Sequence, residues 1–442
     1  MTQKIMYLIV ALGCLWAVGC GDDGGGSDSE DAEDTKELCR DGEDNDGDGD
    51  RDCDDSDCRD FCVEVDTEPD WRTTWVSSQQ LTESKNEPPE EPGLASNTLR
   101  QIIRISVGGE QVRFTFSNEY GEAPLTLASV NVAEQTEKSV IDTDTLVALT
   151  FDGEPTVTIP EGETATSDAV EWHLEAQTDL AVTMLFDDAP PEDITGHPGS
   201  RTMSYLAEGD VMEEESLAGA KVAVHWYFIS RVDVLTSPDV KAVVAFGDSI
   251  TDGFGTVTNE NNRWTDHFLR RLQDSEETDH IAVLNHGIGG NCMTSICLGP
   301  SGTSRFERDA LGPLGVEWVI LLNGINDLNR PKFKAERMID AYESAAEAAR
   351  DAGVFIIGGT IMPCEGHDYF DEDLEAARQE INDWIRTTDR LDAYIDFDEM
   401  FRDPDDETAM LGEYTNDGLH PNASGYEYMA ESIDLGLFAS DE

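Results

Sequence analysis

Apolar and polar residues alternate with a period of two over residues 70–236. The runs 102–107 (IIRISV) and 111–118 (QVRFTFSN) lie on either side of a Gly108-Gly109 pair, a pattern that indicates a β-hairpin. Short strands in such a series are typical of two packed antiparallel sheets. The pattern predicts a β-sandwich domain, jelly-roll-like in its connections, whose further strand-like runs are 125–132, 146–151, 156–159, 180–186 and 224–234.

After Pro238 the pattern changes to short apolar runs that alternate with longer, helix-like stretches. Buried strands joined by helical crossovers indicate a parallel sheet that helices cover on both faces. We therefore predict a three-layer α/β/α domain, flavodoxin-like, over residues 238–442, with its chemistry at the carboxyl ends of the strands. The predicted strands are 243–246, 281–285, 318–323, 354–359 and 393–397, and the predicted helices are 264–274, 335–350 and 372–386.

The N-terminal residues carry a targeting pattern. Lys4 precedes an apolar run, residues 5–18, which is too short to span a bilayer but has the length of a signal-peptide core. The run leads into Cys20, and residues 21–38, acidic and glycine-rich, are predicted to be a disordered linker. Residues 1–20 resemble a bacterial lipoprotein signal in which Cys20 is lipidated. The resemblance implies a chain anchored by lipid at the cell envelope or cell surface; a plain secretory signal is the alternative.

Residues 39–66 carry an aspartate-rich run around Gly49. Its carboxylates have the spacing of positions 1, 3, 5, 9 and 12 of an EF-hand calcium loop, and they belong to Asp44, Asp46, Asp48, Asp52 and Asp55. Position 12 holds an aspartate instead of the usual glutamate, and no flanking amphipathic helices are visible. The segment also looks like the aspartate-rich, cysteine-bearing repeats of bacterial surface proteins. Calcium binding is one hypothesis, and a solvated acidic spacer is the other.

The cysteines fit an exported protein. Cys292 and Cys297 are a close pair, Cys364 has no near neighbour in the sequence, and the other cluster is Cys39, Cys53, Cys58 and Cys62. An oxidising compartment would allow disulfides within these groups, although the sequence leaves their connectivity open.

The charge of the chain excludes one class of partner. Lys and Arg together number 29 against 94 Asp and Glu, which gives a formal net charge of −65. Such a surface repels phosphate backbones and anionic lipid, so we expect no nucleic acid partner and membrane contact only through the lipid anchor.

Three short blocks follow predicted strands in the second half of the chain. The first reads FGDSIT and places Ser249 on a strand-to-helix turn, where its hydroxyl is exposed and its N–H is free. The second, NHGIGGN, contains Gly290, whose backbone can approach a ligand closely. The third, NGIND, contains Asn326, whose amide can donate to a developing oxyanion. Each block taken alone is also compatible with an ordinary turn.

A fourth block lies near the end of the chain. It reads NDGLHPN and places Asp417 three residues before His420. A carboxylate at this spacing can hold one ring nitrogen of the histidine and leave the other to accept a proton from a serine. Asp417 and the acidic surroundings both favour the imidazolium, so the sequence predicts a pKa for His420 at or above neutrality.

The four blocks in this order resemble the SGNH (GDSL-type) hydrolase superfamily over about residues 240–438. The resemblance implies that Ser249 is the nucleophile, His420 the base and Asp417 its orienting partner. It also implies an oxyanion hole formed by Ser249, Gly290 and Asn326. No metal or organic cofactor is needed for that chemistry; Ca²⁺ would bind only in the N-terminal segment.

The strand-rich region before residue 238 resembles a branch of that superfamily with an N-terminal β-domain, which includes acetylxylan esterases. This resemblance implies a serine esterase that acts through an acyl-enzyme on an acetylated glycan. Two alternatives stay open: a lipase or thioesterase for longer acyl chains, and a non-catalytic surface lipoprotein that binds glycan.

Overall fold

The computed structural model describes residues 68–439, which belong to one compact unit. Residues 1–67 and 440–442 lie outside the described residues. The lipidation site at Cys20, the linker, and the calcium-loop-like segment with Asp44, Asp46, Asp48, Asp52 and Asp55 therefore stay predictions. Within residues 68–439, no helix has the length and hydropathy of a membrane span, and no group of three or more His, Cys, Asp or Glu side chains is placed to hold a metal ion.

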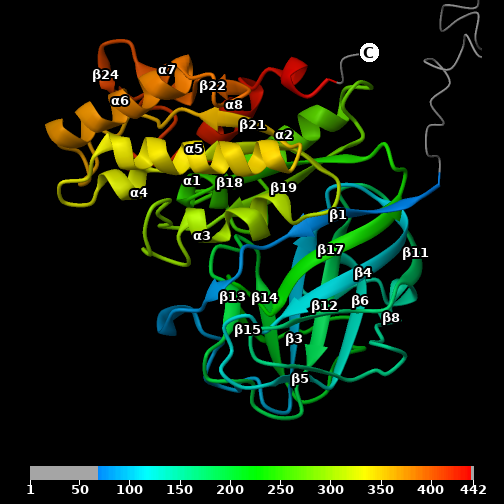
Figure 1. The fold of residues 1–442 in the computed structure, drawn as a ribbon. Helices are drawn as coiled ribbons and strands as arrows, with labels where there is room; N and C mark the ends of the chain where they lie inside the picture. Colours follow the sequence, from blue (N-terminus) through cyan, green and yellow to red (C-terminus); the bar gives the residue numbers. More distant parts are fainter. Residues whose placement is uncertain (1–67, 440–442) are drawn as a thin grey trace, which may run out of the picture. The chain divides into compact units, whose positions relative to one another are not determined.

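Two antiparallel sheets form the β-rich part of the fold (Figure 1). The first has the order β1-β17-β4-β10, with β11 also paired to β4. Its strands are β1 (Asp70–Val76), β17 (Ile229–Thr236), β4 (Gly109–Ser117), β10 (Thr164–Thr166) and β11 (Val170–Leu174). The second has the order β15-β14-β3-β12-β6-β7, with β8 paired to β6. Its strands are β15 (Lys221–Ala223), β14 (Ser204–Glu208), β3 (Asn97–Arg104), β12 (Asp179–Leu185), β6 (Ser129–Glu137), β7 (Val140–Ile141) and β8 (Val147–Ala148).

The two sheets share one hydrophobic core. Phe114 and Phe116 of β4 and Val182 and Met184 of β12 are fully buried in the same cluster. Side chains two residues apart on a strand point to the same face, so the period-two pattern supplies one apolar face to each sheet. The predicted antiparallel sandwich is therefore confirmed.

The predicted hairpin around Gly108-Gly109 is wrong. β3 pairs with β12 and β14, whereas β4 pairs with β17 in the other sheet. The connecting residues cross between the sheets, where Ser106 N–H donates to Thr74 O at 2.9 Å. Two strands that face one core from opposite sheets have the same alternation as two strands of a hairpin, so the sequence pattern cannot separate them.

Smaller elements complete this part of the chain. A three-stranded sheet has the order β16-β13-β2, and β5 pairs with β9. Their bounds are β16 (Trp226–Tyr227), β13 (Thr195–His197), β2 (Gln80–Leu81), β5 (Leu125–Leu127) and β9 (Val157–Ile159), and short 3₁₀ turns lie at η3 (Ser84–Asn86) and η4 (Thr143–Thr145).

From Lys241 onward the strands are parallel. Five of them form one sheet in the order β19-β18-β20-β21-β22. Their bounds are β18 (Lys241–Gly247), β19 (Ile281–Gly287), β20 (Val316–Leu322), β21 (Phe355–Gly359) and β22 (Ala393–Ile395). From β18 the chain passes to β19 on one side of it, and from β19 it crosses to β20 on the other side of β18. This reversal creates a crevice at the carboxyl ends of β18 and β20, where parallel α/β sheets bind ligands.

Helices cover both faces of the parallel sheet, as Figure 1 shows. Val244 and Phe246 are buried in one cluster with residues of α5 and α6, whereas Val243 and Ala245 are buried in a second cluster with residues of α2 and α8. The predicted three-layer α/β/α arrangement is confirmed. The helices are α1 (Ser249–Asp252), α2 (Trp264–Gln273), α3 (Gly302–Phe306), α4 (Ile325–Leu328), α5 (Ala335–Asp351), α6 (Glu372–Thr387), α7 (Phe397–Phe401) and α8 (Ala423–Glu431), with a π-helical turn η5 (Glu307–Leu311) and a 3₁₀ turn η6 (Leu435–Leu437).

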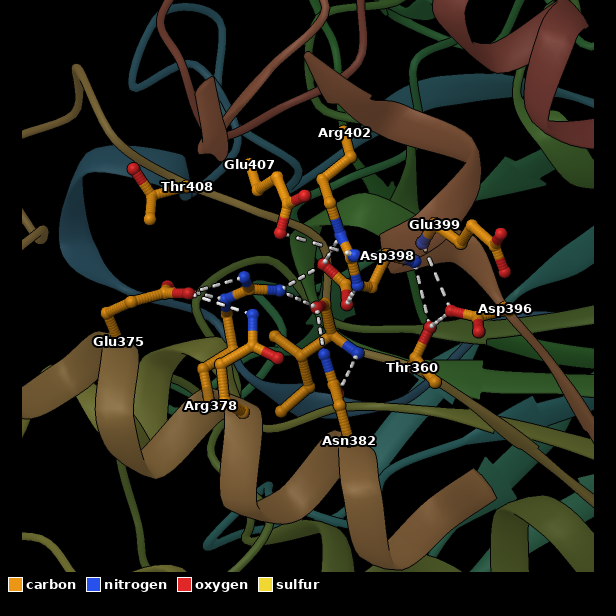
Figure 2. A network of polar contacts seen from close by, with 12 residues as sticks. Thr360, Glu375, Arg378, Asn382, Asp396, Asp398, Glu399, Arg402, Glu407 and Thr408 are labelled. Carbon is orange, nitrogen blue, oxygen red and sulfur yellow. Dashed lines mark hydrogen bonds and ion pairs between the residues drawn. The ribbon is translucent and has the colours of Figure 1, made fainter. Parts of the chain in front are cut away.

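A buried ion-pair cluster fastens α6 to α7 and to the hairpin of β23 (Arg402–Asp403) and β24 (Asp406–Met410) (Figure 2). The Asp398 carboxylate has no exposed surface and lies 2.5 Å from Arg378 and 2.6 Å from Arg386. Arg402 contributes a third contact at 2.5 Å. Asp398 of α7 thus contacts two arginines of α6 and one of β23, and Glu375 and Asp396 supply further negative charge to Arg378 and Arg386.

The predicted division into domains at residues 70–236 and 238–442 stays a prediction. The strands change from antiparallel to parallel at that point, yet the core continues across it. Val232 of β17 and Val244 of β18 belong to the same buried cluster.

Candidate active site

The first candidate residue, Ser249, begins helix α1 directly after β18. Asp248 caps this helix, and its carboxylate accepts a hydrogen bond from Ile250 N–H at 3.1 Å. The N–H groups of a first helical turn have no intrahelical acceptor, so the backbone N–H of Ser249 is oriented as a donor for a ligand. The strand-to-helix turn therefore places both a hydroxyl and a backbone donor at the carboxyl end of β18.

The structure brings Ser249, His420 and Asp417 together in one chain of hydrogen bonds. Ser249 Oγ lies 2.9 Å from His420 Nε2, and His420 Nδ1 lies 2.8 Å from Asp417 Oδ2. The other carboxylate oxygen of Asp417 accepts the N–H groups of Leu419 at 3.0 Å and His420 at 2.8 Å. The three-residue spacing thus folds into a tight loop that holds the carboxylate against the ring.

The surroundings of Asp417 and His420 shift the pKa of each residue from its ordinary value. Burial alone raises the pKa of Asp417, but the backbone and ring hydrogen bonds from His420 outweigh it and lower the pKa to about 2. For His420, burial is the largest effect and lowers the pKa, although Asp417 opposes it. The predicted pKa at or above neutrality is therefore wrong, because desolvation of the ring outweighs its carboxylate partner.

Gly290 and Asn326 lie beside the same serine in the crevice. Gly290 has a φ of +71°, a conformation that costs glycine little, and it lines the cavity that contains Ser249 and His420. Asn326 lies in the first turn of α4, and its side-chain Nδ2 donates to Asn291 O at 2.9 Å. One of the two amide hydrogens is fixed in this way, which leaves the second for another acceptor.

The loop that carries Gly290 is fastened at several points. Cys292 and Cys297 form a disulfide with a Cα–Cα distance of 5.5 Å. The Asp327 carboxylate accepts the N–H groups of Met293 at 2.7 Å and Thr294 at 2.9 Å. Asp327 is adjacent to Asn326, so the block that provides the amide also holds the glycine loop.

Arg305, which the sequence analysis did not single out, connects the strand ends beneath the site. Its guanidinium donates to Gly247 O and to His286 O, both at 2.8 Å, and to Asn291 Oδ1 at 3.0 Å. The side chain has no exposed surface. Arg305 therefore holds Gly247, the residue before Asp248, at a fixed distance from Asn291, the residue after Gly290. No sequence signal marks this role, because a single arginine outside the four blocks has no distinguishing pattern.

Cys364 takes no part in the site. It is a free, buried cysteine, and burial raises the pKa of its thiol to about 12. A thiol that stays protonated is a poor nucleophile, so Cys364 acts as a packed core residue.

The candidate residues surround a cavity of about 410 Å³. Ser249, Gly290, Asn326 and His420 line it, and Asp417 lies behind the histidine. Its other polar lining residues, which sequence reasoning missed, include Gln80, Glu83, Lys85, Asn86, Arg201, His225 and His367. Most of these belong to the β-rich part, and no motif marks them.

The second half of the chain is similar to known proteins. Residues 245–428 match the model of the GDSL-like lipase/acylhydrolase family. No curated protein matches the chain. A GDSL-like lipase from Bacteroides thetaiotaomicron is similar at 19% identity, with 45% of this chain and 88% of that one covered and a TM-score of 0.34. An acetylxylan esterase from Geobacillus stearothermophilus is similar at 21% identity, with 46% and 95% covered and a TM-score of 0.34.

The family match includes all four sequence blocks, from the end of β18 to the loop before α8. The resemblance to the SGNH hydrolases is therefore confirmed. Residues 245–428 are thus similar to the GDSL-like lipase/acylhydrolase family, and this chain is a serine ester hydrolase.

Proposed function

We propose that Ser249, His420 and Asp417 are the catalytic residues of this esterase. The observation that carries the proposal is the continuous set of contacts from Ser249 Oγ to His420 Nε2 and from His420 Nδ1 to Asp417. Asp417 holds the ring with Nε2 toward the serine, where a neutral imidazole accepts the hydroxyl proton. A non-catalytic glycan-binding protein is set aside, because the α/β part is a hydrolase.

The reaction follows as acyl transfer through Ser249. Its oxygen bonds to the ester carbonyl carbon as His420 takes the proton, and the carbonyl electron pair becomes an oxyanion. The N–H groups of Ser249 and Gly290 and the second amide hydrogen of Asn326 stabilise that charge. His420 then protonates the departing alcohol, and the acyl–serine ester remains. Water, activated by His420, cleaves that ester and releases the carboxylic acid.

We infer that the ester is an acetyl group on a carbohydrate. Two features support this inference. The cavity is lined by many hydrogen-bonding side chains, which suit a polyhydroxylated alcohol. Leu298 packs on Gly290 so closely that a Cβ there would lie 2.7 Å from Leu298 Cδ1. The leucine therefore occupies space beside the oxyanion loop, which favours a short acyl group.

A second candidate is an esterase for longer acyl chains. Phe254 and Leu298 both line the cavity and remain 47% and 42% exposed, so they offer apolar surface at its mouth. An acyl chain that covered these side chains would gain hydrophobic contact.

Purified protein and the Ser249→Ala variant should be compared on acetylated xylan, other acetylated glycans and aryl esters of two, four and eight carbons. We expect kcat/KM to fall with acyl length and the variant to lose about a million-fold in kcat. Circular dichroism of the variant controls for folding. Near-normal turnover by Ser249→Ala would refute the nucleophile, and a preference for eight carbons would favour the second candidate.

A further inference from the structure

One wall of the active-site cavity comes entirely from the β-rich part of the chain. Two segments supply it, residues 80–86 and residues 198–201, together with His225. Glu83 accepts hydrogen bonds from Gln80 and Asn86, both at 2.8 Å, so hydrogen bonds within the first segment stabilise its conformation. Ser249, Gly290, Asn326 and His420 all come from the other side, the α/β part. The hydrolase domain alone therefore builds only part of the cavity.

The second segment is locked onto the helix that carries the nucleophile. Asp252, three residues after Ser249, is buried and lies 3.0 Å from His197 Nε2. Its other carboxylate oxygen accepts a hydrogen bond from Arg201. A Cβ on Gly199 would lie 1.9 Å from Asp252 Oδ1, so the backbone passes directly over the carboxylate. The position of the segment relative to Ser249 is thus fixed.

Arg201 keeps hydrogen-bond donors that its partner does not use. Its Nη2 donates to Asp252, whereas Nε has no acceptor among the described residues. Nη1 likewise has none within the described part of the chain, and the side chain is 24% exposed at the cavity that it lines. Arg201 also has a φ of +51°. Non-glycine residues rarely adopt this conformation, and it persists where surrounding contacts impose it, often at ligand sites.

The guanidinium of Arg201 lies near the catalytic histidine. Its central carbon is 5.7 Å from the centre of the Phe254 ring, and that ring is 4.4 Å from the ring of His420. The positive charge of Arg201 contributes to the lowered pKa of His420. Asp252 neutralises that charge in the pair, so an anionic ligand gains little from it. The unused N–H groups suit neutral oxygens instead, such as hydroxyl and ether groups.

We propose that Arg201 binds the alcohol part of the ester, so that the β-rich part of the chain selects a polyhydroxylated leaving group. The inference rests on the proposed function and adds its specificity-determining residue. The oxygens of a sugar beside the scissile bond accept the N–H groups of Arg201. The acyl group occupies the side formed by Gly290 and Leu298.

The test compares two acetate esters, an O-acetylated xylooligosaccharide and 4-nitrophenyl acetate, which has no sugar oxygens. The variants are Arg201→Gln, Arg201→Lys and His197→Gln. Arg201→Lys keeps the charge next to Asp252 and guards against loss of folding. His197→Gln removes the neighbouring contact to Asp252 but no donor to the substrate. Glu119→Gln is the matched control, because Glu119 pairs with Arg308 across the same boundary and does not line the cavity.

The measured quantity is kcat/KM for the sugar ester divided by kcat/KM for the aryl ester. Both Arg201 variants should lower this ratio by about tenfold to a hundredfold, which is the loss expected for charge-assisted hydrogen bonds. His197→Gln should lower kcat/KM for both esters by the same factor and leave their ratio unchanged. Glu119→Gln should change neither activity. An unchanged ratio in both Arg201 variants would overturn the proposal while leaving the esterase assignment intact. A wild-type protein that hydrolyses only the aryl ester would overturn the carbohydrate substrate and this proposal together.

Discussion

At the residue scale, the side chains around the proposed oxyanion hole are held by groups far away in the sequence. Asn326 bonds to Asn291 O, and Asn291 bonds in turn to Arg305. A donor whose position is fixed before the substrate binds needs no reorganisation when charge develops, and this is the source of its value in catalysis.

Replacement of Asn326 by alanine should lower kcat by about a hundredfold to a thousandfold with a smaller change in KM, because the hydrogen bond strengthens in the transition state. Steady-state kinetics on an aryl acetate measures both constants. Asn329→Ala is the matched control, since Asn329 caps the end of the same short helix and is exposed. A rise in KM at unchanged kcat would mean that Asn326 only binds substrate.

At the scale of elements, the ion-pair cluster in Figure 2 holds α6, α7 and the β23–β24 hairpin together. Burial alone raises the pKa of Asp398, but its contacts with Arg402 and Arg378 outweigh it and lower the pKa to about 2. The folded pKa is below the unfolded value near 3.9, so this stabilisation is complete above about pH 4 and is lost as the pH falls toward 2.

Asp398→Asn should therefore reduce the free energy of unfolding at neutral pH by about 3–5 kcal/mol, the cost of removing one partner from a buried charge cluster. Urea denaturation at several pH values measures this difference, which should shrink between pH 4 and pH 2. Asp383→Asn is the control, because Asp383 is 77% exposed and its pair with Arg386 is 3.7 Å long. Equal effects of the two substitutions would contradict the role of the buried cluster.

At the scale of the whole molecule, two opposing influences set the pKa of His420, the proposed catalytic base. The net charge of −65 favours the imidazolium, whereas burial of the ring, the largest effect, lowers the pKa of His420 below 6.5. Salt screens distant surface charges, but it does not change the effect of burial on the pKa of the ring.

We expect kcat/KM on a non-ionising ester to rise with pH, to be half-maximal below pH 6.5 and then to level off, because only neutral His420 accepts the serine proton. Added sodium chloride should shift that midpoint downward, since it screens the acidic surface that favours the charged ring. An equal concentration of sucrose controls for viscosity and osmolarity. A midpoint above pH 7 would show that burial does not dominate, and a flat profile from pH 5 to 9 would exclude a histidine base.

The sequence predicted the elements of the catalytic part closely. Residues 264–274 were predicted as a helix and α2 covers Trp264–Gln273, and residues 281–285 were predicted as a strand and lie within β19. These elements are long or strongly apolar, so their periodicity is local information that tertiary contacts reinforce. The hairpin prediction failed, because the pairing of β3 and β4 with other strands depends on which sheet each one joins.

By itself, the sequence determined the α/β architecture and the two sheets before it. It also determined the four blocks that contain Ser249, Gly290, Asn326 and His420. Short-range spacing encodes turns and strand ends, and it places Asp417 within reach of its histidine. Only the tertiary structure decided the rest. It placed Arg201 and residues 80–86 on the wall of the cavity and Arg305 beneath it. It also reversed the expected shift of the histidine pKa. These properties depend on burial and on contacts between residues that are distant in the chain, and neither burial nor such contacts leave a local pattern in the sequence.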